Sequence, residues 1–162
     1  MLSWSQGEVV EIRRSRDTRP WQHVLEPLSG YLQLGANLYQ DITNHGEAYN
    51  FGPPADQNYS VRELIDEMSK YWDRVRWKDI SQYKKHLHEA GLLKLNCDKA
   101  LADLNWKPTL KFEETVKMTV KWYRYYYENS QKSNPRSVYD YTLSQIEGYS
   151  HLAKQRKMSW AV

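Results

Sequence analysis

Four arginines stand close together near the start of the chain, and arginine is well suited to binding phosphate. Arg13, Arg14, Arg16 and Arg19 precede a proline and a tryptophan. A planar guanidinium donates two hydrogen bonds to one phosphate group, and a neighbouring aromatic ring can stack on a base or a sugar. A solvated loop would have the same composition. The pattern is therefore either a phosphate site or a solvated loop.

A second candidate is a pair of histidines, His86 and His88, which Glu89 follows directly. On a strand, residues two apart point to the same face, as two metal ligands must. The sequence offers no evident third ligand. A polar loop and hydrogen bonding to a bound ligand are the other interpretations, and we predict no metal site.

Motifs that several large enzyme classes require are missing from the sequence. It has no glycine-rich phosphate loop of the dinucleotide or nucleoside triphosphate type, and no serine in a nucleophile elbow. The single cysteine, Cys97, precedes Asp98, and an acidic neighbour disfavours the reactive thiolate. One cysteine also excludes an internal disulfide and is typical of a reducing cytoplasm. We predict a cytoplasmic protein and assign no catalytic residue.

Length and composition indicate one globular domain with an aromatic core. The chain has 162 residues, among them 7 tryptophans and 13 tyrosines, far more than disordered chains carry. A net charge of +3, spread over the whole length, does not favour nucleic acid as a partner. No apolar run approaches the roughly 18 residues of a membrane span. The amino terminus lacks a basic region followed by an apolar run, so we expect no secretory signal.

Short strands alternating with helices predict an α/β fold. A β-branched run predicts a strand at 9–12, and short apolar or alternating runs predict strands at 48–51, 74–77 and 92–95. Residues 21–24 are expected to form a short extended stretch. Helical periodicity and capping signals predict helices from Pro27, behind a capping box at Ser60, behind Asn96, over 112–127 and over 139–149. The predicted division is a main portion at 1–128, a linker at 129–136, and a carboxyl-terminal amphipathic helix and tail at 137–162.

The segment from Thr18 to Leu32 reads Thr-Arg-Pro-Trp-Gln-His-Val-Leu-Glu-Pro-Leu-Ser-Gly-Tyr-Leu. It closely resembles a signature of the CDP-glucose 4,6-dehydratases, extended short-chain dehydrogenase/reductases that modify nucleotide sugars. Weaker blocks follow in the family's order at 49–53, 60–61, 88–95, 99–100, 104–108, 119–123 and 142–146. Together they cover nearly the whole chain.

The resemblance implies a carboxyl-terminal, substrate-binding portion of such an enzyme, with late elements of the Rossmann domain. In the intact family NAD removes a hydride from C4 of the glucose, water leaves across C5 and C6, and the hydride returns to C6. The family's glycine-rich NAD loop and Tyr-x-x-x-Lys pair are not found here, so the nucleotide-binding half is absent. The chain alone is therefore expected to be inactive and to bind no NAD.

The resemblance also assigns substrate-binding residues. Arg19 matches an arginine on the pyrophosphate, and Asn50 matches an asparagine of the substrate pocket. His88 and Glu89 fall in a late segment that closes over the nucleotide. The remaining arginines of the first cluster are expected to add diffuse charge. Asn105 replaces a usual glycine, so it is expected to adopt a positive φ.

The implied partners are a CDP-sugar and either an amino-terminal half or further copies of the chain, with no nucleic acid and no membrane. A competing hypothesis is a non-catalytic interaction module, or a partner subunit, derived from the same family. The missing cofactor motif and the tyrosine-rich helix faces favour that alternative.

Overall fold

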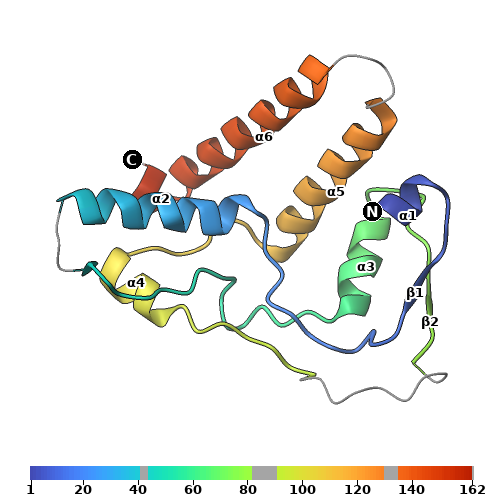
Figure 1. Ribbon diagram of the computed structural model, residues 1–162, viewed down its shortest axis with the longest axis horizontal. Helices are drawn as coiled ribbons and strands as arrows, with labels where there is room; N and C mark the ends of the chain where they lie inside the picture. The colour runs from blue at the N-terminus through green and yellow to red at the C-terminus, as the bar shows by residue number, and fades with distance from the viewer. Residues whose placement is uncertain (41–43, 82–90, 130–134, 162) are drawn as a thin grey trace.

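The computed structural model describes residues 1–40, 44–81, 91–129 and 135–161. Most of the regular structure is helical, and the short strands lie at one end of the view in Figure 1. The helices are α1 (Leu2–Ser5), α2 (Leu25–Gln40), α3 (Val61–Ser69), α4 (Asp98–Leu104), α5 (Phe112–Asn129) and α6 (Pro135–Gln155). The strands are β1 (Val10–Ile12) and β2 (Trp77–Asp79), and a short 3₁₀ turn spans Ser159–Ala161.

The two strands pair in parallel, with Val10 opposite Trp77 and Ile12 opposite Asp79. Parallel strands need a long crossover, and here α2 and α3 lie between them in the sequence. The fold is therefore mixed α/β, as the sequence predicts, although its described part has only this two-stranded sheet.

Two of the predicted strands are wrong: 48–51 and 92–95 form no ladder. The extended stretch expected at 21–24 has no regular structure up to residue 23 and turns at residue 24. Leu92 forms a single isolated bridge with Thr18, and it is exposed, as is Leu93. In the segment at 48–51, hydrogen bonds from the side chains of Tyr49 and Asn50 replace strand pairing. The strand predicted at 74–77 begins only at Trp77, because a turn closes from Val75 N–H to the Trp72 carbonyl.

The helix signals were more reliable. Ser60 and Glu63 form the predicted capping box at the start of α3, and α5 covers the predicted 112–127. At the end of α4, Asn105 has the predicted positive φ, 50°. Helix α2 begins two residues before Pro27, which therefore lies in its first turn, where proline is tolerated. Helix α6 begins at Pro135 rather than near Tyr139.

Aromatic rings dominate the core, as the composition predicts. The largest cluster joins α1, α3 and α5, with Trp72 and Val116 each 1% exposed at its centre. Tyr59 stacks on Phe112 in this cluster, with 3.7 Å between ring centroids. A second cluster packs Phe51 and Trp106 between α2 and α4. None of the described helices combines the length and apolar character needed to span a bilayer.

Candidate functional site

The first candidate site residue, Arg19, lies in a short extended segment that two other parts of the chain flank. Thr18 bridges to Leu92 on one side and to Ser60 on the other. The Thr18 N–H donates to the Gly91 carbonyl over 2.9 Å. Further along, the Gln22 side-chain amide donates to the carbonyl of residue 51 over 3.0 Å. The backbone that carries Arg19 is therefore fixed on both flanks.

The turn at Arg19 is tight. The Trp21 N–H donates to the Arg19 carbonyl over 2.9 Å, and Pro20 lies between them. The Trp21 indole N–H donates to the Tyr59 carbonyl over 2.8 Å, and its ring packs against the main core. These contacts of Trp21 hold the backbone that carries Arg19 in place.

The Arg19 guanidinium remains partly accessible. Its Nη1 donates to the Thr18 carbonyl over 2.7 Å, and its Nη2 lies 3.4 Å from Asp17 Oδ2. The side chain is 28% exposed. A partly exposed guanidinium on a fixed backbone can meet an anion without a large change in the chain.

The second candidate, Asn50, is exposed and lies next to Phe51, whose carbonyl accepts the Gln22 side-chain amide. Its Nδ2 donates to the Asn96 carbonyl over 3.2 Å. Asn96 lies one residue before Cys97, the N-cap of α4, and its Oδ1 accepts the N–H of Asp98, the first residue of that helix, over 2.9 Å. Asn50 thus holds the chain that leads into α4 against the segment before Phe51.

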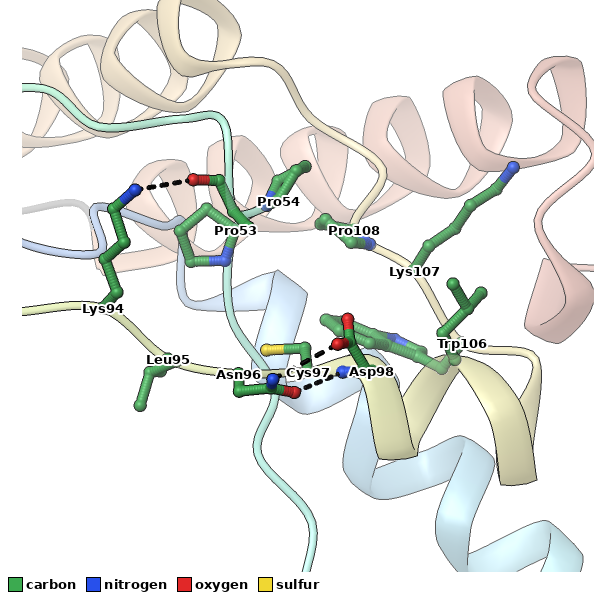
Figure 2. A pocket seen from close by; sticks show the side chains of 12 residues that line it. Pro53, Pro54, Lys94, Leu95, Asn96, Cys97, Asp98, Trp106, Lys107 and Pro108 are labelled. Atoms are coloured by element: carbon green, nitrogen blue, oxygen red, sulfur yellow. Dashed lines mark hydrogen bonds between the residues drawn. The ribbon is translucent and has the colours of Figure 1, made fainter.

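A cavity of about 580 Å³ opens beside Asn96 (Figure 2). Prolines and the Trp106 ring supply apolar walls, and two lysines, Lys94 and Lys107, lie at its edges. Cys97 also lines it. Burial raises the pKa of the Cys97 thiol and the charge of Asp98 raises it further, so the thiolate is disfavoured.

In the described part of the chain, no hydrogen bond joins Arg19 to Asn50. His86, His88 and Glu89 lie outside the described residues, so the structure says nothing of their geometry. Within residues 1–40, 44–81, 91–129 and 135–161, no three histidine, cysteine or acidic side chains are grouped to hold a metal ion.

Sequence reasoning missed Glu26, which is 1% exposed. Its carboxylate accepts the N–H groups of Thr109 and Leu110, over 2.9 and 2.6 Å, and the Tyr149 hydroxyl over 3.0 Å. Burial raises the pKa of Glu26, while these hydrogen bonds and nearby Arg156 act to lower it. In the sequence, Glu26 is a single acidic residue at the start of an apolar helix face. Acidic residues are common in the first turn of helices, so the sequence gives no reason to single it out.

No protein-family model matches the chain. Over 125 residues the chain is 38% identical to a CDP-glucose 4,6-dehydratase of Salmonella typhimurium, and the match covers 76% of the chain. The chain is a relative of the CDP-glucose 4,6-dehydratases. This finding confirms the resemblance drawn from the segment at 18–32. The chain spans about a third of the Salmonella protein, 34% of its length.

Proposed function

We propose that the chain binds a CDP-sugar as the substrate-binding portion of a CDP-glucose 4,6-dehydratase. The observation that carries the proposal is the fixed, partly exposed guanidinium of Arg19 within the segment that most resembles the family. In this proposal the chain is the carboxyl-terminal portion of an extended short-chain dehydrogenase/reductase. Residues 1–128 form the substrate-binding portion, 129–136 the linker, and 137–162 the terminal helix and tail.

Arg19 would contact the diphosphate. A diphosphate carries more negative charge than the single carboxylate of Asp17, which lies 3.4 Å from Nη2. The guanidinium can present two parallel N–H groups to phosphate oxygens, which lysine cannot reproduce. The ligand would therefore draw this edge of the guanidinium away from Asp17.

Asn50 would orient the sugar, because its exposed amide has both a donor and an acceptor for hydroxyl groups. Its hydrogen bond to Asn96 over 3.2 Å sets the direction of the side chain. His88 and Glu89 would close over the nucleotide. These three assignments rest on the family resemblance.

The chain has no glycine-rich loop of the dinucleotide-binding type, so we propose that NAD, which the intact family uses, is held outside this chain. In this proposal the chain contributes to the reaction by binding and orienting the sugar nucleotide. Holding the substrate in position lowers the entropic cost of the reaction. We propose that the chain is inactive when alone.

Calorimetric titration of the purified chain with CDP-glucose tests the role of Arg19. We expect Arg19→Lys to weaken binding of CDP-glucose by about 1.5–3 kcal/mol. Lysine keeps the positive charge but cannot donate the pair of parallel hydrogen bonds that arginine gives to phosphate oxygens. Arg76→Lys is the matched control, since Arg76 is exposed and lies before β2, outside this site. Equal binding by the Arg19→Lys and wild-type chains would contradict the assignment.

The interaction-module alternative has one observation in its favour. Helix α2 exposes large apolar side chains, with Leu32 76% and Tyr39 94% exposed. A chain that associates through α2 and shows no binding of CDP-glucose at millimolar concentration would favour that alternative over substrate binding.

A further inference from the structure

Arginines from two separate elements surround a hollow of about 600 Å³ that includes neither Arg19 nor Asn50. The hollow lies at the carboxyl ends of both strands. Its lining includes Arg13, Arg14 and Arg16 after β1, Arg62 of α3, and Asp79 and Ser81 at the end of β2. Sequence reasoning saw only the first three, because Arg62 is distant in sequence.

The backbone around the hollow is tied down. The Arg62 N–H donates to the Ser15 carbonyl over 2.8 Å, and the Val61 N–H donates to the Asp17 carbonyl over 2.9 Å. The loop after β1 is therefore joined to the first turn of α3. The backbone that carries the loop arginines is therefore held next to the backbone of Arg62.

The two carboxylates in the hollow are already engaged. Asp79 accepts the Ser15 hydroxyl over 2.5 Å and the Ser81 N–H over 2.8 Å. These hydrogen bonds, with a smaller contribution from the positive charge of Arg62, lower the pKa of Asp79 to about 2, so it stays ionised. Asp17 lies 3.5 Å from Arg14 and 3.4 Å from the arginine at position 19.

Three arginines of the lining retain donors for a ligand. Within the described residues, no carboxylate lies within ion-pair distance of Arg13, Arg16 or Arg62. The Arg62 guanidinium stands over the Trp77 ring, 5.6 Å from its centroid, which holds it in place while its edge stays available. Four arginines and two aspartates line the hollow, so positive charge prevails there.

We propose that this hollow binds a phosphate or diphosphate group of a small ligand through Arg13, Arg16 and Arg62. Guanidinium groups match phosphate oxygens in geometry and charge. The volume lies in the range of small-molecule sites. The inference goes beyond the proposed sugar-nucleotide site at Arg19 and stands without it. The group can be free diphosphate or the diphosphate of a nucleotide, since both present the same oxygens.

Calorimetric titration of the full chain with inorganic pyrophosphate at low salt tests the proposal. We expect saturable binding that Arg62→Gln weakens about tenfold, as the loss of one charge-assisted hydrogen bond predicts. Arg16→Gln should weaken pyrophosphate binding by a similar factor. Because Arg16 is exposed and lies outside any helix or strand, this substitution should leave the fold intact. Arg76→Gln removes a charge before the opposite end of β2 and should change the Kd less than twofold.

Several results would overturn the proposal. If Arg76→Gln weakened pyrophosphate binding as much as Arg62→Gln, the anion would be held by diffuse positive charge and not by the hollow. Pyrophosphate binding that is lost in Arg19→Lys but kept in Arg62→Gln would place the anion at Arg19, leaving the proposed function intact. Tight binding of a single-stranded oligonucleotide that pyrophosphate does not displace would mean a nucleic-acid surface. A parallel titration with CDP, compared with pyrophosphate, shows which source of diphosphate the hollow prefers.

Discussion

At the residue scale, Glu26 joins three parts of the chain that are far apart in sequence. Its carboxylate on α2 accepts from Thr109 and Leu110 before α5 and from Tyr149 on α6. Ser29, one turn later, accepts the Trp106 indole N–H over 3.0 Å and the Tyr149 hydroxyl over 3.2 Å. Burial and the Glu26 charge raise the pKa of the Tyr149 phenol, so the phenol remains a donor at neutral pH.

We expect Glu26→Gln to lower the free energy of unfolding by about 1–3 kcal/mol. An amide has one accepting oxygen, so its NH₂ group would face a buried donor and leave it unpaired. Urea denaturation measures the loss. Glu113→Gln, an exposed change in the first turn of α5, is the control and should cost less than about 0.5 kcal/mol. A loss no greater than that of the control would contradict this account of Glu26.

Only some residues of the candidate sites could be identified from the sequence. Arg19 and Trp21 lie in one contiguous motif, so the sequence alone singles them out, and the Trp21 indole N–H donates to the Tyr59 carbonyl. Arg62 and Glu26 could not be assigned, because their partners lie at Ser15 and at 109–110, and only folding brings them together.

At the element scale, the end of α4 depends on one backbone conformation. Asn105 adopts a φ of 50°, and the next N–H, of Trp106, donates back to the Ala100 carbonyl over 3.2 Å. Asparagine tolerates the left-handed region better than other side-chain-bearing residues, and glycine adopts it without steric cost.

Asn105→Ala should therefore destabilise the chain by about 1 kcal/mol, whereas Asn105→Gly should leave its stability equal or slightly raised. Thermal unfolding followed by circular dichroism compares the two variants. If alanine were tolerated as well as glycine, the left-handed conformation at this position would not matter to stability.

Elements were predictable where local chemistry decides them. The capping box at Ser60 and the apolar stripe of α5 are properties of adjacent residues. The strands were not, because a short period-two run carries no information on whether another strand will pair with it. Segment 48–51 shows this: Tyr49 bonds to Asp103 and Asn50 to Asn96 through side chains, and no ladder forms.

At the scale of the whole molecule, α2 and the paired strands lie toward opposite ends of the view in Figure 1. Along α2, Leu28, Tyr31, Leu32, Leu38 and Tyr39 are all more than a third exposed. So much apolar surface on one helix is typical of an interface. It fits a chain that spans a third of a longer relative's length.

We expect the purified chain to self-associate through this helix. Leu32→Glu should shift it toward monomer in sedimentation velocity, because a buried, unpaired carboxylate opposes association. Leu2→Glu, at a residue 59% exposed on α1, is the control and should leave the association unchanged. A sharply monomeric wild-type chain at high concentration, with a cooperative thermal transition, would contradict the expectation.

The central claim is that the chain binds a CDP-sugar. Calorimetric titration of the purified chain with CDP-glucose tests it most directly, with CDP, UDP-glucose and NAD in parallel. The account predicts saturable binding of CDP-glucose, weaker binding in Arg19→Lys, and no binding of NAD. No heat of binding with CDP-glucose, or the same affinity in wild type and Arg19→Lys, would contradict the claim.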